Sequence, residues 1–547
     1  MKSTMMQVPL NLSHFLERAG KLFGGQEIVS RMPDKSLHRY TYADFYRRTR
    51  QLAEGLQRAG LKRGDRVATL MWNHYAHYES YFGVIVAGGV MHTLNLRLAP
   101  EDIAFIANHA QDRFLVVDDI LLPLFEKFRD KVNLERVIVV PLEGKPVPAG
   151  FDDYEALLRT ATGDFDYPEM DENEPCAMCY TSGTTGRPKG VVYSHRSQIL
   201  HSLVQALPDA IGISGSDVIL PVVPMFHANA WGVPYTAAML GVKMVFPGPH
   251  LHPDHLLPLL ESEQVTVSCG VPTIWLPMVQ MLDSNPGRWK FSPRLRLTVG
   301  GSAVPESMIR AYAKHGILVM QGWGMTETSP LASIAKITAQ QEQLNADERF
   351  KVMATQGYPL PLVDIRAVDD GGEAPWDGKT VGEIQVHGPW ITGRYHDNPA
   401  PDSFAGDGWL RTGDVAAIDP LGFIKITDRT KDLIKSGGEW ISSVDLENAI
   451  MGHPAVQEAA VISVPHPKWA ERPLAVIVLK PKHHADESDI RAHLAKQFVK
   501  WMVPDGYVFV DAIPRTSTGK FLKTKLREQY RDWQWPETAT TAKKDVA

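Results

Sequence analysis

Apolar residues in the first third of the chain alternate between helical and strand spacing. Over residues 42–59, Phe45, Leu52 and Leu56 recur on one side of a predicted helix, which ends at Gly60. Short apolar runs that predict strands lie at 67–71, 114–117 and 137–140. Strands that alternate with helices predict a parallel sheet with helices on both faces.

The same alternation resumes beyond residue 190. Apolar strand candidates lie at 218–223, 242–246, 265–269, 295–299 and 317–320. Two α/β sheets are the most economical interpretation. From about residue 351 to residue 426 the pattern changes to short β-like runs, such as 383–386, separated by Gly, Pro and Asp turns. This part of the chain predicts a small β-rich subdomain.

The C-terminal part of the chain has strands and helices of its own. Strands are predicted at 461–464, 474–479 and 507–510, and helices at 486–498 and 522–530. We therefore predict an α/β fold with a large N-terminal domain of two α/β sheets plus a small β-rich subdomain (1–427), a hinge (428–433) and a mobile α+β C-terminal domain (434–547).

Composition and charge limit the function classes. A chain of 547 residues is long enough for two or more domains, and 44% apolar with 22% charged residues is typical of a soluble globular protein. A formal net charge of -6 gives no reason to expect nucleic acid as a partner. The most apolar stretch, 81–91, is far shorter than the roughly 20 residues that cross a bilayer, so only peripheral membrane contact stays open.

The N-terminus and the cysteines favour a cytoplasmic protein. Residues 1–20 lack the basic start, long apolar run and cleavage site of a signal peptide. Cys176, Cys179 and Cys269 cannot all pair, and no second cysteine pair or His/Cys cluster accompanies Cys176-x-x-Cys179. We expect buried thiols in a reducing compartment rather than disulfides or zinc.

Candidate chemistry centres on residues 180–190, which read Tyr-Thr-Ser-Gly-Thr-Thr-Gly-Arg-Pro-Lys-Gly. Backbone N–H groups of such a loop can turn toward a polyphosphate with a cation alongside. The spacing of Gly183, Gly186 and Lys189 is G-x-x-G-x-x-K, and no Gly-Lys-Ser/Thr follows, so this is not a Walker A loop. Because Ser/Thr/Gly clusters are also common surface turns, the loop alone leaves both interpretations open.

Five motifs in series resemble the core motifs of the adenylate-forming superfamily. They are Tyr180–Gly190, Gly322–Thr328, Arg411–Asp414, Asp428–Asp432 and Pro514–Lys520. Within that superfamily the chain is most similar to the bacterial medium- and long-chain fatty acyl-CoA synthetases, through Val223–Trp231 and Lys435–Ser443. The resemblance implies ATP, Mg²⁺ and coenzyme A, an acyl-adenylate intermediate, release of AMP and diphosphate, and a homodimer.

The resemblance also implies site residues. Glu327 and the hydroxyl of Thr181 would hold Mg²⁺, since a hard cation takes oxygen ligands, and Lys520 and Lys435 complete the catalytic set. The implied nucleotide-binding residues are Thr181, Ser182, Gly183, Thr184, Thr185, Gly186, Lys189, Gly301, Gln321, Gly322, Trp323, Thr326, Asp414, Arg429, Lys431, Lys435 and Trp440. Trp323 stands where the family usually has tyrosine, and it is either an adenine contact or a core tryptophan.

If Lys520 serves the adenylation step but blocks the thioester step, the domain that carries it has to move between the two half-reactions. Attack of a carboxylate on ATP needs negative charge cancelled, which suits Lys520, whereas the CoA thiol needs the same face opened. By resemblance, the C-terminal domain rotates about Lys431, which brings Lys435 and Trp440 to the adenylate, and Gly437-Gly438 allows a pantetheine channel. The alternative is that Lys435–Gly438 is only an interdomain linker.

The acyl group is expected beside a wall of small residues. The acyl-pocket residues implied are His227, Ala228, Trp231, Gly300 and Ser302, with Trp231 as a movable gate by analogy with the long-chain enzymes. His227 fits a core histidine equally well, and no base is needed because the attacking carboxylate is already ionised.

Several alternative functions share the fold. One is a CoA ligase for a short or methylthio-substituted acid, of the 3-methylmercaptopropionate type. A carrier-protein-loading adenylation enzyme would place an aspartate in the region that reads Phe226-His-Ala-Asn229. A luciferase-like oxygenase and a non-catalytic protein built on a decayed enzyme complete the set, and the intact charged positions disfavour the last.

Overall fold

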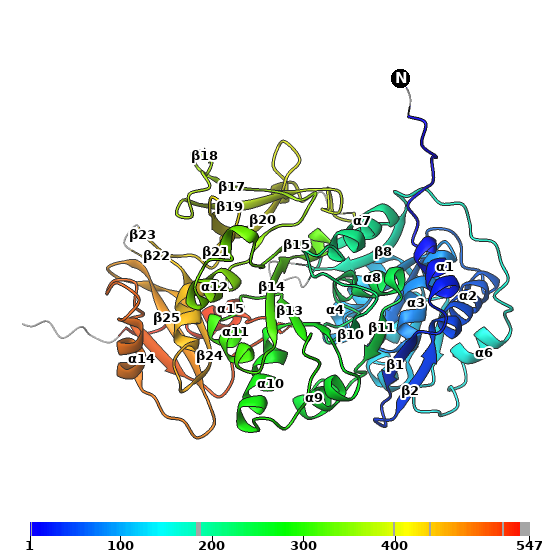
Figure 1. Ribbon diagram of the computed structural model, residues 1–547, viewed down its shortest axis with the longest axis horizontal. Helices are drawn as coiled ribbons and strands as arrows, with labels where there is room; N and C mark the ends of the chain where they lie inside the picture. The colour runs from blue at the N-terminus through cyan, green and yellow to red at the C-terminus, as the bar shows by residue number, and fades with distance from the viewer. Residues whose placement is uncertain (2, 182–186, 398–399, 437–438, 517–518, 536–547) are drawn as a thin grey trace, which may run out of the picture.

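The structure is a computed structural model that describes residues 1, 3–181, 187–397, 400–436, 439–516 and 519–535. Its elements form four sheets, and Figure 1 shows the C-terminal domain, orange to red, at one end of the molecule with α1–α3 (Ser13–Leu22, Tyr42–Arg58 and Tyr75–Val86), blue, at the other. The predicted arrangement of two α/β sheets, a β-rich subdomain and an α+β C-terminal domain is confirmed.

One α/β sheet has seven strands. In spatial order they are β7 (Asp152–Asp153), β6 (Arg136–Val140), β5 (Asp112–Asp118), β3 (Arg66–Leu70), β4 (Val90–Thr93), β8 (Pro175–Tyr180) and β9 (Gly190–Ser194). Its neighbours pair in parallel except β8 and β9, which form an antiparallel hairpin at the edge. The glycine-rich segment connects these two strands, so the edge hairpin fixes both ends of that loop.

The other α/β sheet has nine strands. In spatial order they are β16 (Tyr358–Pro359), β15 (Leu331–Ile334), β14 (Leu318–Gly324), β13 (Arg296–Gly300), β12 (Val267–Gly270), β10 (Val218–Pro221), β11 (Lys243–Phe246), β1 (Glu27–Arg31) and β2 (Leu37–Thr41). The five predicted strands are β10 to β14. The sequence did not predict the hairpin of β1 and β2, which joins this sheet by parallel pairing of β1 with β11.

Helices cover and connect the two sheets. Helix α2 begins at a capping box formed by Thr41 and Asp44, and it buries Phe45, Leu52 and Leu56 as the periodicity predicts. Every residue of α3 is buried, so the first part of the most apolar stretch, 81–86, belongs to a core helix, and its last residues begin β4. No helix in the described part of the chain is long and apolar enough to cross a membrane. Other helices are α4 (Pro100–Ala110), α5 (Leu122–Phe125), α6 (Tyr154–Arg159), α7 (His195–Gln205), α8 (Val233–Leu240), α9 (Pro253–Ser262), α10 (Pro272–Ser284), α11 (Glu306–Lys314) and α12 (Ala346–Met353).

The β-rich subdomain is a five-stranded antiparallel sheet. Its strands, in spatial order, are β18 (Gly372–Glu373), β17 (Asp364–Asp369), β19 (Val381–His387), β20 (Leu410–Ile418) and β21 (Ile424–Arg429). The register of β20 and β21 sets Asp414 opposite Arg429. Two of the sequence motifs therefore meet through strand pairing.

The C-terminal domain has a sheet and hydrophobic clusters of its own. Strands β23 (Glu439–Ile441), β22 (Ile434–Ser436), β25 (Ala470–Leu479) and β24 (Val456–His466) are neighbours in that order, and β26 (Gly506–Phe509) pairs with β25. Its helices are α13 (Ser443–Met451), α14 (Glu487–Leu494) and α15 (Lys523–Gln529). Apolar side chains on both faces of β24 and β25 are buried, which gives this domain an independent core.

Candidate active site

A cavity of about 540 Å³ lies where the sequence motifs converge. Its walls come from the ends of β8, β13, β14 and β21 and from the C-terminal loop that carries Lys520. The predicted site residues that line it are Thr181, Lys189, His227, Ala228, Trp231, Gly300, Gly301, Gly322, Trp323, Thr326, Glu327, Arg429, Lys431 and Lys520. The fold therefore collects residues from both domains around one space.

A smaller cavity of about 200 Å³ adjoins the first, because Gly301, Gly322 and Trp323 line both. Gln321 and Asp414, two of the predicted nucleotide-binding residues, line this second cavity. Ser302, which the sequence places in the acyl wall, lines this smaller cavity. Ser182, Gly183, Thr184, Thr185 and Gly186 lie outside the described residues.

Asp414 is the centre of a polar triad. The indole Nε1 of Trp323 donates to Oδ2 of Asp414 at 2.9 Å, and Nε of Arg429 forms an ion pair with Oδ1 at 3.0 Å. The charge of Asp414 raises the pKa of Arg429 above its ordinary value. Because both carboxylate oxygens are engaged and Asp414 is 4% exposed, its orientation is fixed.

Glu327 is held by a tyrosine that the sequence analysis missed. The hydroxyl of Tyr395 donates to Oε1 of Glu327 at 2.7 Å, and burial, followed by the Glu327 carboxylate, raises the pKa of Tyr395 far above its ordinary value. The ammonium of Lys189 lies 4.6 Å from the centre of the Tyr395 ring and 3.3 Å from Oγ of Ser403. A carboxylate and a cation thus face the same part of the cavity.

The ends of the glycine-rich loop are tied together. The backbone N–H of Lys189 donates to Oγ1 of Thr181 at 3.1 Å, and the N–H of Thr181 donates to the carbonyl of Lys189 at 3.0 Å. These bonds set the hydroxyl of Thr181 and the ammonium of Lys189 beside the cavity. The base of the loop therefore has a defined geometry.

The residues present fit Mg²⁺ that arrives with a nucleotide. Among the described residues no group of three or more His, Cys, Asp or Glu could hold a metal, so a site made of protein ligands alone is not formed there. Glu327 and Thr181 both line the cavity and offer oxygen. Mg²⁺ commonly uses one or two carboxylates together with substrate phosphates and water, which matches this donor set.

Lys520 enters the cavity from the C-terminal domain. A Cβ placed on Gly301 would lie 3.8 Å from Cε of Lys520, and Gly301 has a left-handed φ of +84°. Burial, and then the positive charge of Arg429, lowers the pKa of Lys520 to about 8. A half-buried lysine close to a second cation is suited to binding an anion.

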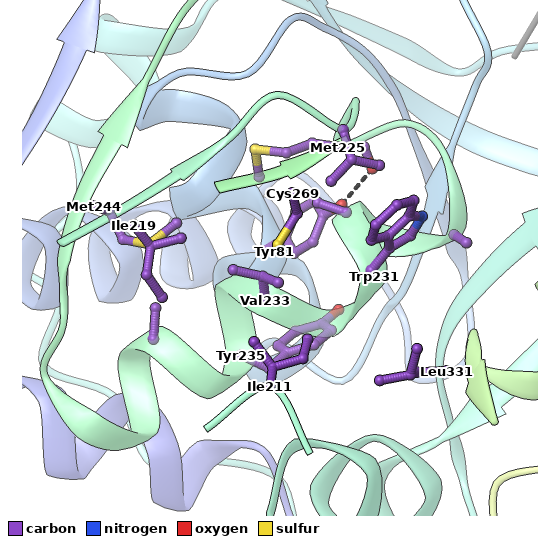
Figure 2. Packing of buried hydrophobic residues seen from close by; sticks show 14 of the residues in the cluster. Tyr81, Ile211, Ile219, Met225, Trp231, Val233, Tyr235, Met244, Cys269 and Leu331 are labelled. Carbon is purple, nitrogen blue, oxygen red and sulfur yellow. Dashed lines mark hydrogen bonds between the residues drawn. The ribbon is translucent and has the colours of Figure 1, made fainter. Parts of the chain in front are cut away.

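The other end of the cavity is apolar and strained. Trp231, Gly300 and Leu331 form its wall, and a Cβ on Gly300 would lie 2.6 Å from the carbonyl oxygen of Gly322, so only glycine fits there. Residues 228–231 all have a left-handed φ between +42° and +59°, which costs roughly 1–2 kcal/mol per non-glycine residue. Figure 2 shows Trp231 in the packing cluster with Met225, Tyr235 and Leu331.

His227 lines the cavity as a neutral side chain. Burial, and then the charges of Lys520 and Arg97, lowers the pKa of His227 to about 3. A ring with that pKa is uncharged at neutral pH. His227 therefore serves the wall of the cavity without adding positive charge.

Lys435 and Trp440 lie away from the cavity. They face each other across the hairpin of β22 and β23, with the ammonium 5.2 Å from the ring centre. Both side chains are exposed, and neither lines either cavity. The structure brings the Lys520 face of the C-terminal domain to the site, and the roles of Lys435 and Trp440 stay predictions. Gly437 and Gly438 lie outside the described residues.

Two family models match the chain. The model for AMP-binding enzyme matches residues 16–396, and the model for AMP-binding enzyme C-terminal domain matches residues 445–520.

Three curated relatives are similar over nearly the whole chain. A long-chain-fatty-acid–CoA ligase from Thermus thermophilus is 50% identical, with 97% of this chain and 97% of the relative covered. A 3-methylmercaptopropionyl-CoA ligase from Ruegeria lacuscaerulensis is 43% identical, with 97% and 99% covered. A medium-chain-fatty-acid–CoA ligase from Ectopseudomonas oleovorans is 41% identical, with 97% and 98% covered.

Solved structures share the architecture. The ATP-bound MatB from Rhodopseudomonas palustris has a TM-score of 0.81 at 26% identity, with 96% of this chain and 99% of that chain covered. The anthranilate CoA ligase AuaEII in complex with anthranoyl-AMP has a TM-score of 0.85 at 24% identity, with 97% and 99% covered, which supports the fold.

Proposed function

Because the chain belongs to the AMP-binding enzyme family, we propose that it is an AMP-forming acyl-CoA ligase that activates a medium- or long-chain fatty acid. It converts ATP, the acid and CoA to acyl-CoA, AMP and diphosphate through an acyl-adenylate. The observation that carries the proposal is one cavity with Lys520, Arg429 and Lys189 along its polar part and the apolar wall at Trp231 and Leu331. An anionic nucleotide and an apolar acid match those two parts.

In the adenylation step the nucleotide is oriented by the polar triad. Asp414 accepts hydrogen bonds from the ribose hydroxyls, and Trp323 packs on the adenine. Lys189 and the glycine-rich loop hold the outer phosphates, while Lys520 reaches the carboxylate and the α-phosphate. Glu327 and Thr181 would hold Mg²⁺, which when bound supplies neutralisation of the phosphate charge. These cations let one anion attack another.

In the thioester step the C-terminal domain turns about Lys431. The arrangement with Lys520 in the cavity serves adenylation, and rotation withdraws Lys520 and brings Lys435 and Trp440 to the adenylate. The thiol then reaches the acyl carbon from the side that Lys520 had occupied. Domains bounded at 1–427 and 434–547, joined by 428–433, are part of this proposal.

A second candidate substrate is a short methylthio-substituted acid. The relative of Ruegeria lacuscaerulensis, 43% identical, is named for 3-methylmercaptopropionate. The relatives named for long-chain and medium-chain fatty acids, at 50% and 41% identity, support the longer acids. A carrier-protein-loading enzyme is less well supported, because the segment Phe226–Asn229 holds no aspartate for an ammonium group.

A panel assay tests the proposal. The purified protein is given ATP, Mg²⁺ and acids of increasing length, and exchange of labelled diphosphate into ATP and loss of the CoA thiol are followed in parallel. Turnover that rises with chain length supports the fatty acid. Highest turnover with the methylthio acid selects the second candidate, and no exchange with any apolar acid refutes both.

The pKa of Lys520 predicts how the rate of adenylation falls at alkaline pH. Since the charged lysine is the active form and its pKa is about 8, kcat/KM for ATP in diphosphate exchange should fall as the pH rises through about 8. Lys520→Arg keeps its charge at every accessible pH, so its residual activity should not show that fall. A wild-type profile that is flat to pH 10 contradicts the assignment.

Trp323 gives a test of nucleotide binding. Trp323→Phe keeps an aromatic ring but loses the hydrogen bond to the Asp414 carboxylate, worth about 2 kcal/mol, so KM for ATP should rise about thirtyfold with kcat nearly unchanged. Trp323→Tyr, which restores the residue usual in the family, is the matched control. Steady-state kinetics with saturating acid measure both, and a fall in kcat at constant KM contradicts the role.

Assembly and location are further parts of the proposal. A homodimer rests on the resemblance, and light scattering of the purified protein tests it. A cytoplasmic location is supported by Cys176, Cys179 and Cys269, which are free, buried thiols. Peripheral membrane contact would help a protein that takes up apolar acids, and vesicle co-sedimentation measures it.

A further inference from the structure

Helix α7 turns a polar face toward the interior of the protein. Gln198, His201, Ser202 and Gln205 recur at the spacing of one helix face, and none of them is exposed. A helix face that is buried in this way is normally apolar. These side chains therefore need polar partners inside the protein.

This polar face lies directly behind the acyl end of the cavity. Nε2 of Gln205 donates to the carbonyl of Trp231 at 2.7 Å, and Nε2 of His201 accepts the backbone N–H of Leu331 at 3.2 Å. Trp231 and Leu331 both line the cavity. Two side chains of α7 thus bond directly to the backbone of two residues that line the cavity.

Most of the polar atoms on this face have no partner among the residues that the structure describes. They are Nδ1 of His201, Nε2 and Oε1 of Gln198 and Oγ of Ser202. Because Nε2 of His201 accepts a hydrogen bond, its Nδ1 carries the proton and is a free donor. Buried polar atoms almost always have a partner, so a group of them without one calls for an explanation.

The facing elements add two more such atoms. Nδ2 of Asn229 and the hydroxyl of Tyr235 are buried and also lack a partner among the described residues. Tyr235 and Trp231 belong to the same packing cluster (Figure 2). Helix α7 packs against α8 and the turn at 228–232, and Oγ1 of Thr236 in α8 donates to Oε1 of Gln205 at 2.8 Å. The unpartnered atoms on these elements are hydrogen-bond donors and acceptors. Burial lowers the pKa of His201 to about 3, so its side chain is uncharged at neutral pH.

The wall between the cavity and this face is the strained turn. A Cβ on Gly232 would lie 2.8 Å from Nδ1 of His201, so the glycine lets the imidazole approach the turn. Residues 228–231 keep left-handed backbone angles that side chains disfavour. Backbone strain of this kind is concentrated at ligand clamps and switch regions, which makes this turn the element of the wall that we expect to move.

We propose that the polar face of α7 is the distal subsite of the acyl pocket and that it binds the terminal hydroxyl of an ω-hydroxy fatty acid when the Trp231 turn opens. This inference rests on the proposed function and narrows its substrate class. A hydroxyl both donates and accepts, as Gln198 and Ser202 require. A methyl terminus would leave them unpaired, and sites built for a hydroxyl discriminate strongly against analogues that lack it.

Matched acids test the subsite. Each ω-hydroxy acid is compared with the unsubstituted acid in which a methyl group replaces the hydroxyl, across a ladder of chain lengths, by kcat/KM in diphosphate exchange. At one length the wild type should favour the hydroxy acid about tenfold. The double variant Gln198→Met, Ser202→Ala should lose that preference, because its kcat/KM for the hydroxy acid falls relative to that for the unsubstituted acid.

Stability provides an internal check. Because the side chains of Gln198 and Ser202 form no hydrogen bond with any residue that the structure describes, the double variant should melt at or above the wild-type temperature. Ser30→Ala removes another buried hydroxyl, in β1, that also has no partner among those residues, and it should leave the selectivity unchanged.

Two outcomes would overturn the inference. They are equal kcat/KM for the paired acids at every length, and a preference that survives in the double variant, which would assign these atoms to internal water alone. If the wild-type protein turned over none of the acids, the proposed function itself would be refuted.

Discussion

Replacing Lys520 with alanine should remove most adenylation and leave thioester formation intact. Lys520 is the lining residue that the C-terminal loop places against Gly301, and loss of one preorganised charge at a developing anion costs about 10²–10³-fold in rate. We expect diphosphate exchange to fall by that factor, while conversion of supplied acyl-AMP and CoA to acyl-CoA proceeds at the wild-type rate.

A control variant and a complementary variant accompany Lys520→Ala. Lys525→Ala removes an exposed lysine of α15, near Lys520 in sequence, and should change neither half-reaction. Lys435→Ala should show the reverse of Lys520→Ala, because Lys435 is exposed and distant from the cavity in the present arrangement. Equal losses in both half-reactions for Lys520→Ala would contradict the division of labour between two faces of one domain.

The alternation of apolar runs along the sequence was enough to predict most of the fold. Strands β10 to β14 are largely buried, so each is a short run rich in apolar residues that stands out in the sequence. The hairpin of β1 and β2 was missed because its residues are mixed in character and its partner β11 is about two hundred residues away. Pairing at that distance leaves no local signal.

The residues of the candidate site also fall into two groups, those that a sequence motif marks and those that only the folded chain reveals. Glu327, Asp414 and Lys520 were found because motifs mark them, and the fold brings all three to adjoining cavities. Tyr395, which holds Glu327, comes from a loop with no motif, and only the folded chain shows the contact. The face of α7 had a signal in the spacing of Gln198 and His201, but polar residues at helical spacing are normally taken for a solvent-facing side.

Glu327→Gln should raise the Mg²⁺ concentration that diphosphate exchange requires. The amide keeps the shape of the side chain and can accept the Tyr395 hydroxyl, but it loses the negative charge that a hard dication prefers. At fixed Mg²⁺ we expect diphosphate exchange to fall about 10²-fold, and raised Mg²⁺ to recover part of the loss. A titration of rate against Mg²⁺ concentration at constant ATP measures the shift.

Two controls separate charge from geometry in that experiment. Tyr395→Phe keeps the carboxylate and removes one hydrogen bond of about 2 kcal/mol, so the rate should fall by at most about thirtyfold with the Mg²⁺ dependence unchanged. Glu383→Gln removes a second carboxylate that lines the cavity, one paired with Arg411 at 3.4 Å, and should not alter the Mg²⁺ curve. If Glu383→Gln shifted that curve as much as Glu327→Gln does, the effect would belong to the general negative charge of the cavity, and Glu327 would lose its place as the metal ligand.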